Sequence, residues 1–232
     1  MSEVLVACSH GTDDARGRSA VATIVADVAR LAPEIDVREA FVDVQSPSLV
    51  EVAAATTPAE DVVIVPLLLS AGFHTYVDIA EAAESSGAAA AGTLGPDPRL
   101  VDIVVERLHE AGARPDDVIV LAAAGSSDAR AITAVESMLT AVRERWGTDV
   151  TVAYGGVEPR VPDVVAQLRA GAPDGARVVL ASYLLAPGFF LDRLHEAGAD
   201  VVTAPLAPDP RLAEIVLDRY RAARDAAGAR TS

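Results

Sequence analysis

The sequence contains no lysine and no asparagine, so all 19 of its basic residues are arginine. The absence of lysine excludes Schiff-base catalysis and the phosphate-binding lysine of a P-loop, because both need an amino group. Cys8 is the only cysteine. A single cysteine excludes an internal disulfide framework and any paired-cysteine metal or redox site, and it is typical of a reducing compartment. We therefore expect a cytoplasmic protein.

The sequence also lacks the patterns of an export signal and of a membrane-spanning helix. Its first residues lead directly into an apolar strand pattern, without a basic region followed by a long apolar segment. The longest apolar stretch, residues 62–73, is interrupted by Pro66 and is shorter than the roughly 20 residues that a spanning helix needs. We expect no membrane partner.

Positive charge is scarce as well, since 34 acidic residues outweigh the basic ones and the formal net charge is −15. A nucleic-acid-binding protein must neutralise phosphates, so this balance excludes nucleic acid as a partner. Hydrophobic residues make up 51% of the 232 residues, which is enough for one large core or two small ones.

Three segments of the first half recur in the second half at nearly the same offset. The sequence GPDPRL at 95–100 recurs as APDPRL at 207–212, and DAR at 14–16 recurs at 128–130. PLLLSAGFH, from Pro66 to His74, aligns with SYLLAPGFF, which begins at Ser182. Three matches with nearly the same offset predict an internal duplication.

Each half alternates apolar strand patterns with helical patterns, which predicts four βα units per half. Near-continuous apolar runs such as VVIVPLLL are typical of parallel strands covered on both faces. We therefore predict an α/β fold of two tandem Rossmann-like domains, each with a four-stranded, mainly parallel sheet flanked by helices. The polar, proline-containing segment at 113–117 suggests domains at 1–114 and 115–232. The expected strands lie near 3–9, 35–42, 61–69, 88–93, 117–123, 149–155, 176–185 and 200–206, and the helices of the first half near 17–32, 47–57, 76–85 and 97–112.

Ligands of open α/β sheets bind beyond the carboxyl ends of the strands, and in the first half those positions carry reactive side chains. The first strand ends in the sequence SHGT, which contains His10, the second leads to Asp43, and the third leads to His74. Two neutral imidazoles form an incomplete ligand set for a divalent first-row metal, which suits an ion that must be released to a substrate. Asp43 could balance the metal charge or accept protons. For either histidine alone, a loop residue bonded to backbone is an equally good interpretation.

The remaining candidates have ordinary structural interpretations. His109 and His195 lie near the ends of predicted helices, where an exposed role is expected. Cys8 shares the strand face of His10, but a small buried residue in a central strand is the simpler interpretation.

The second half carries Ala124 and Phe190 at the positions equivalent to the two histidines. We therefore predict that the metal site belongs to the first domain only, and that the second, degenerate domain completes a cleft for the substrate. Phe189 and Phe190 could pack on a flat ligand there, or they could be core aromatics.

The motif SHGT at 9–12, the motif PLLLSAGFH at 66–74 and the following Asp78 and Ile79 resemble those of the CbiX/SirB sirohydrochlorin chelatases, also called class II chelatases. The resemblance covers the whole chain. It implies two lobes around a cleft, with the incoming metal held by His10 and His74 and no need for ATP. It also implies a lyase that inserts Fe²⁺, or next Co²⁺, into sirohydrochlorin for sirohaem or cobalamin biosynthesis, with Ni²⁺ a further option. Many relatives have glutamate where this chain has Asp43.

A tetrapyrrole with many carboxylates needs local hydrogen-bond donors on so acidic a protein. We expect Ser9, Thr12, Ser126 and Phe190 to contact the substrate, with Arg16 and Arg130 as further donors or as solvated helix residues. No permanently bound cofactor is expected, and the duplication favours a monomer that is an internal pseudo-dimer. The alternatives are a non-catalytic metal or tetrapyrrole carrier of the same fold, and an unrelated α/β protein that binds a small ligand or a nucleotide.

Overall fold

The structure, a computed structural model, describes residues 2–57, 59–70, 72–172 and 175–229. Within these ranges, the side chains of residues 73–76 are not described. The chain forms two compact units. Unit 1 consists of Met1–Leu94 and Pro208–Ser232, and unit 2 consists of Gly95–Ala207.

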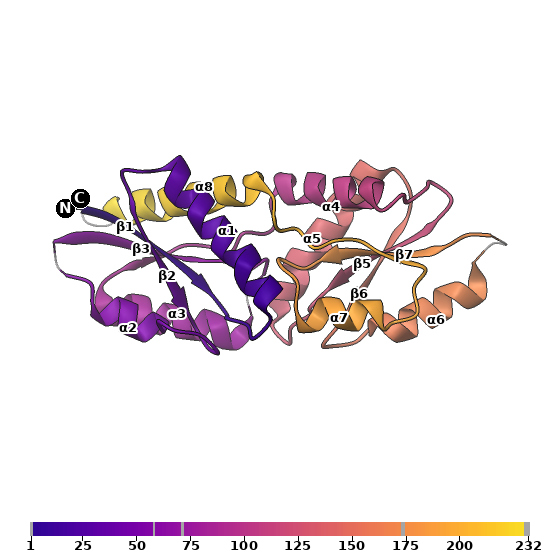
Figure 1. Cartoon of the computed structure of the whole chain (residues 1–232), viewed down its shortest axis with the longest axis horizontal. Helices are drawn as coiled ribbons and strands as arrows, with labels where there is room; N and C mark the ends of the chain where they lie inside the picture. The colour runs from indigo at the N-terminus through magenta and orange to yellow at the C-terminus, as the bar shows by residue number, and fades with distance from the viewer. Residues whose placement is uncertain (1, 58, 71, 173–174, 230–232) are drawn as a thin grey trace. The chain divides into compact units, whose positions relative to one another are not determined.

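Unit 1 is a parallel four-stranded sheet with helices on both faces (Figure 1). The strand order is β2-β1-β3-β4, so the two most apolar strands are central. The elements are β1 (Ser2–Ser9), α1 (Ala15–Leu31), β2 (Asp36–Phe41), α2 (Leu49–Ala54), β3 (Glu60–Pro66), α3 (Phe73–Ser86), β4 (Ala89–Ala90) and α8 (Pro210–Gly228).

The core of unit 1 lies on both faces of this sheet, as the near-continuous apolar strands predict. Alternate residues of β1, such as Val4 and Val6, pack in one buried cluster with Leu49 of α2 and Ile79 of α3. Helices α1 and α8 lie side by side, and α8 covers β3 on the opposite face (Figure 1). Burial on both faces explains why so few polar residues occur in β1 and β3.

Unit 2 repeats this architecture with the strand order β6-β5-β7-β8, again all parallel. The predicted fold of two duplicated α/β domains is therefore confirmed. The elements are α4 (Pro98–Glu110), β5 (Val118–Ala123), α5 (Ala129–Trp146), β6 (Val150–Tyr154), α6 (Val161–Gly171), β7 (Val178–Tyr183), α7 (Phe189–His195) and β8 (Val201–Val202).

The last helix of each predicted domain, 1–114 and 115–232, belongs to the other compact unit. Helix α4 packs on α5 and β7 of unit 2, whereas α8 packs on α1 and β3 of unit 1. The same hydrogen bond anchors each helix: Arg219 donates to the carbonyl of Leu94 (2.9 Å), and Arg107 donates to the carbonyl of Leu206 (3.3 Å). The compact units therefore end near residues 94 and 207 instead of 114, because each sheet is covered by the final helix of the other sequence half.

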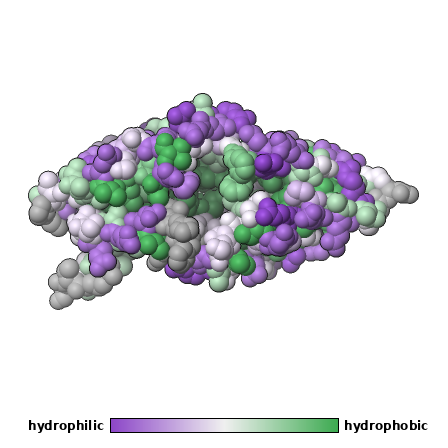
Figure 2. Space-filling model, turned by 90° about the horizontal axis from the view of Figure 1, so that it is seen from below, coloured by the Kyte–Doolittle hydropathy of each residue, from purple (hydrophilic) through white to green (hydrophobic). Residues whose placement is uncertain are grey.

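The visible surface of each unit is largely hydrophilic (Figure 2). In Figure 2, hydrophilic side chains cover much of the visible face of each unit, and hydrophobic side chains are scattered among them. Among the helices that the structure describes, none is both long enough and apolar enough to span a membrane.

Candidate functional site

His10 and Asp43 lie in adjacent loops at the carboxyl edge of the unit 1 sheet. The parallel register of β1 and β2 pairs Ser9 with Phe41, and the pairing continues past the strand ends. Val42 N donates to Ser9 O (3.0 Å), and Asp43 N donates to His10 O (2.9 Å). Both His10 and Asp43 are exposed. The structure thus brings two of the three predicted residues into neighbouring positions.

The third predicted residue, His74, lies in the first turn of α3, which follows β3 at the same edge of the sheet. The backbone of Leu67 extends the pairing of β3 with β1, since its N–H donates to Cys8 O (2.7 Å). The side chain of His74 lies outside the described residues. Its role as a metal ligand therefore stays a prediction.

Gly11 allows the loops that carry His10 and Asp43 to come very close together. Its φ is +94°, a left-handed conformation that side chains disfavour. A Cβ atom at this position would lie 2.2 Å from the carbonyl oxygen of Asp43. The glycine of the SHGT motif is therefore required by the close approach of these two loops.

Two side chains beside His10 are buried. Cys8 belongs to the core cluster under α2 and α3, and burial raises the pKa of its thiol to about 12, with the negative charge of Asp78 adding to the rise. This burial in a central strand agrees with the core interpretation of Cys8. The hydroxyl of Ser9 is also buried, and it has no hydrogen-bond partner among the described residues.

The hydroxyl groups of Thr12 in unit 1 and Ser126 in unit 2 make equivalent hydrogen bonds. Thr12 Oγ1 accepts a hydrogen bond from Asp14 N (3.1 Å), and Ser126 Oγ accepts one from Asp128 N (3.1 Å). A hydroxyl that accepts one bond still has its own proton to donate. Arg16 and Arg130, by contrast, each bind the carboxylate of the helix-capping aspartate two residues before them.

Unit 2 has the same loop contacts but none of the three reactive side chains. Gly155 N donates to Ala123 O (2.9 Å), and Gly156 N donates to Ala124 O (2.8 Å). This register makes Ala124 equivalent to His10 and Gly156 equivalent to Asp43. The comparison of the two sequence halves identified Ala124 and Phe190 but missed Gly156. The reason is that the difference in residue number between equivalent positions is not the same in the two loops.

Phe190 packs over the loop that replaces the candidate site in unit 2. A Cβ atom on Gly155 would lie 2.7 Å from Cδ1 of the Phe190 ring, so only glycine fits under it. The ring is partly buried against the core of unit 2. Phe189 is 66% exposed, and the guanidinium of Arg193 lies 5.2 Å from its ring centroid.

The other two histidines, His109 and His195, are exposed. The ring of His109 lies 5.1 Å from that of Trp146, and His195 is the last residue of α7. Among the described side chains, no group of three or more histidine, cysteine, aspartate or glutamate residues could hold a metal ion. The side chain of His74 is not among the described side chains.

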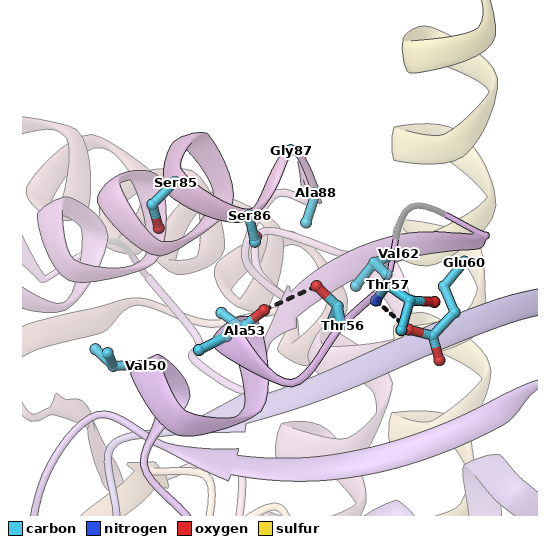
Figure 3. A pocket seen from close by; sticks show the side chains of 11 residues that line it. Val50, Ala53, Thr56, Thr57, Glu60, Val62, Ser85, Ser86, Gly87 and Ala88 are labelled. Atoms are coloured by element: carbon cyan, nitrogen blue, oxygen red, sulfur yellow. Dashed lines mark hydrogen bonds between the residues drawn. The ribbon is translucent and has the colours of Figure 1, made fainter.

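A cavity of about 560 Å³ lies at the opposite, amino edge of the unit 1 sheet (Figure 3). It is formed where α2 and α3 end and β3 begins. Its polar groups already have partners, since Thr56 Oγ1 donates to Ala53 O (2.8 Å) and Glu60 Oε2 accepts from Thr57 N (2.6 Å). The cavity therefore offers few free groups to a ligand, and it is not the candidate site.

Comparison with known proteins gives one family and one fold. The CbiX family model matches residues 4–111 and 118–223. The structure resembles SirB from Bacillus subtilis with Fe³⁺, with a TM-score of 0.80, 19% identity, and coverage of 97% of this chain and 96% of that chain. It also resembles SirB from Bacillus subtilis subspecies spizizenii in complex with cobalt (TM-score 0.75, 18% identity, 97% and 96% coverage).

A third similar structure is CbiX, described as the terminal enzyme for biosynthesis of siroheme in denitrifying bacteria (TM-score 0.68, 19% identity, 95% and 99% coverage). A comparison with curated protein sequences finds no match. Because the family model covers nearly the whole chain in two successive matches, the chain belongs to the CbiX family, with two tandem copies of the family's repeat.

Proposed function

We propose that this chain is a metal chelatase that inserts a divalent metal ion into sirohydrochlorin, with Fe²⁺ favoured and Co²⁺ next. The observation that carries the proposal is the difference between two units of one architecture. The same loop contacts present His10 and Asp43 in unit 1 but Ala124 and Gly156 in unit 2. The similar structures support this chemistry, since they include SirB with iron, SirB with cobalt and a CbiX enzyme of siroheme biosynthesis.

In this proposal, His10 and His74 hold the metal ion as neutral imidazoles. Two imidazoles leave coordination positions open, so the nitrogen atoms of the macrocycle can enter while the histidines leave. Two pyrrole N–H protons are released as the divalent ion enters, which balances the charge without ATP. We assign the exposed carboxylate of Asp43 as the acceptor of these protons.

We assign Thr12 as a donor to a substrate carboxylate, because its hydroxyl accepts only from Asp14 N and keeps its own proton. Ser126 is the equivalent candidate in unit 2. Ser9 and Phe190 are less suited to this role, because the hydroxyl of Ser9 is buried and the ring of Phe190 packs on the loop of its own unit.

The test is anaerobic insertion of Fe²⁺, Co²⁺ and Ni²⁺ into sirohydrochlorin, followed by absorbance. We expect multiple turnovers with the wild-type protein. His10→Ala and His74→Ala should each lower the rate at least about 100-fold, because loss of a ligand costs more than loss of an outer-shell partner. His195→Ala, which removes another exposed imidazole, is the control and should leave the rate unchanged.

Two outcomes would count against the proposal. A His10→Ala/His74→Ala protein that still metallates sirohydrochlorin well above the spontaneous rate would show that the site is elsewhere. A single turnover with excess substrate would instead favour the carrier function. Circular dichroism of each variant would show that the fold is retained.

A further inference from the structure

Gln45 joins the loop after β2 to the loop after β1 in unit 1. Its Oε1 atom accepts a hydrogen bond from the backbone N of Thr12 (2.9 Å), across 33 residues of sequence. A backbone N–H can only donate, so the oxygen of the amide must face Thr12. This bond adds a side-chain link to the backbone bond between Asp43 and His10.

The turn that places Gln45 is strained. Val44 has a φ of +63°, which is a costly conformation for a β-branched residue. Gln45 N donates to Asp43 O (2.6 Å), and an i to i+2 bond around a residue with positive φ is the pattern of a rare γ-turn. Asp43 Oδ1 also accepts from Val44 N (2.8 Å). The chain thus reverses directly after Asp43.

Unit 2 provides a natural comparison in which this link is missing. Phe41 N donates to Pro47 O, and Tyr154 N donates to Pro159 O, so these residues mark equivalent ends of the loops. Between them the loop of unit 2 is one residue shorter. A Cβ atom on Gly125 would lie 2.8 Å from Cγ2 of Val157.

The side chain of Val157 thus lies beside Gly125 at this junction in unit 2. Among the described residues of the shorter loop, no side chain accepts a hydrogen bond from Ser126 N. The side-chain link therefore occurs only in the unit that carries His10 and Asp43.

We propose that Gln45 is a positioning residue for the metal site of unit 1. Its bond to Thr12 holds the loop of His10 against the loop of Asp43, so that the imidazole and the carboxylate keep a constant separation as the metal ion enters and leaves. Gln45 acts through these loops and is not itself a ligand. The inference rests on the proposed chelatase function and adds a residue to it.

Two substitutions of similar length separate the hydrogen bond from side-chain packing. Gln45→Met removes the acceptor and leaves Thr12 N–H without its partner, whereas Gln45→Glu keeps an oxygen at the same reach. We expect Gln45→Met to raise the KM for the metal ion about fivefold to tenfold, the usual effect of one hydrogen bond, with kcat changed less than about twofold. Gln45→Glu should keep the KM at or below the wild-type value.

The measurement is metal insertion at varied Fe²⁺ or Co²⁺ concentration, together with titration of the protein with Co²⁺ alone, followed by visible absorbance. The Co²⁺ titration gives a dissociation constant that does not depend on turnover. Thermal unfolding of each variant is recorded in parallel, because a purely structural role would lower the melting temperature without changing the KM.

Distinct results would overturn the inference and the proposed function. Equal KM values for wild type and Gln45→Met would overturn the positioning role, as would equal impairment by Gln45→Met and Gln45→Glu. In both cases the proposed chelatase function would still stand if the wild-type protein inserts metal and the His10→Ala variant does not. A wild-type protein that neither inserts metal nor binds Co²⁺ would overturn the function and this inference with it.

Discussion

Asp117 is a buried carboxylate that ties together the starts of two adjacent strands in unit 2. Its side chain is 0% exposed, and it accepts hydrogen bonds from Arg177 Nε (3.1 Å) and from an Arg114 nitrogen (3.0 Å). The bond from Arg177, followed by that from Arg114, holds the pKa of Asp117 well below its usual range. Since β5 follows Asp117 and β7 follows Arg177, this ion pair stabilises the pairing of the central strands.

A lowered pKa in the folded state has a definite sign for stability. Asp117 stabilises unit 2 above its unfolded pKa of about 3.9, and this stabilisation is lost as the pH falls towards the folded pKa. Asp117→Asn should lower the free energy of unfolding at pH 7 by about 2–4 kcal/mol, because two guanidinium groups lose their charged partner. The variant should also show a smaller decline of stability from about pH 5 downwards.

Denaturant unfolding at a series of pH values measures both effects of the Asp117 substitution. Asp116→Asn is the control, because the side chain of Asp116 is 72% exposed. Surface ion pairs contribute little, so this control should stay within about 0.5 kcal/mol of wild type. Similar losses in the two variants would contradict the role assigned to Asp117.

Four of the helices begin with the same aspartate and arginine arrangement. In each, the aspartate before the helix accepts a hydrogen bond from the backbone N two residues later, and it also binds the guanidinium of that residue. The pairs are Asp14 with Arg16, Asp97 with Arg99, Asp128 with Arg130, and Asp209 with Arg211. Two of the three repeated sequences that predict the duplication are therefore the starts of α1, α4, α5 and α8.

Asp209→Ala should weaken α8, because the helix loses its capping acceptor and Arg211 loses its carboxylate partner. We expect the free energy of unfolding to fall by about 1–2 kcal/mol. Asp225→Ala is the matched control on the same helix. Asp225 is exposed near the C-terminal end of α8, where a negative charge is slightly unfavourable, so its removal should be neutral or weakly stabilising. Chemical denaturation compares the two, and equal losses would contradict the capping role.

One edge strand of each sheet, β4 in unit 1 and β8 in unit 2, is shorter than the sequence predicts. Strands were expected near 88–93 and 200–206, but β4 and β8 contain two residues each. Beyond them the chain stays beside the neighbouring strand through single bonds, such as Leu94 N to Leu68 O and Leu206 N to Leu184 O (2.8 and 2.9 Å). The local hydrophobic pattern of the sequence located these edge segments correctly. The length of regular pairing, however, depends on the neighbouring strand, which the local pattern does not describe.

The exchange of α4 and α8 determines which parts of the chain can fold alone. Helix α8 contributes six buried residues to unit 1, which are Leu212, Ala213, Ile215, Val216, Leu217 and Tyr220. Burial of one large apolar side chain is worth about 1.5–3 kcal/mol, so this helix supplies roughly 10 kcal/mol. A typical domain is stable by only about 5–15 kcal/mol.

We therefore expect the fragment 95–207 to fold cooperatively and the fragment 1–114 to remain unfolded or loosely packed. The first fragment contains every element of unit 2, whereas the second lacks α8. Circular dichroism melts and binding of a hydrophobic dye measure the difference. A cooperative melt of fragment 1–114 would contradict the division into these compact units. Fragment 115–232, which lacks α4, is the reciprocal control and should also fail to fold.

Several features of this protein follow from the sequence alone. The order of strands and helices follows from local hydrophobic period, and the duplication follows from the repeated helix starts and strand exits. The positions of His10, Asp43 and His74 after three strands predict one shared edge, because the carboxyl ends of parallel strands lie together. The predicted proximity of His10 and Asp43 agrees with the bond between their backbones.

Other features were decided only by tertiary structure, because they depend on contacts between distant segments. The packing of α4 and α8 is one, since both helices have the same local pattern and either could cover either sheet. The equivalence of Gly156 with Asp43 and the bond of Gln45 to Thr12 are others. Local sequence determined which side chains this edge of unit 1 could offer, and the approach of two loops over Gly11 decided how His10 and Asp43 are held together.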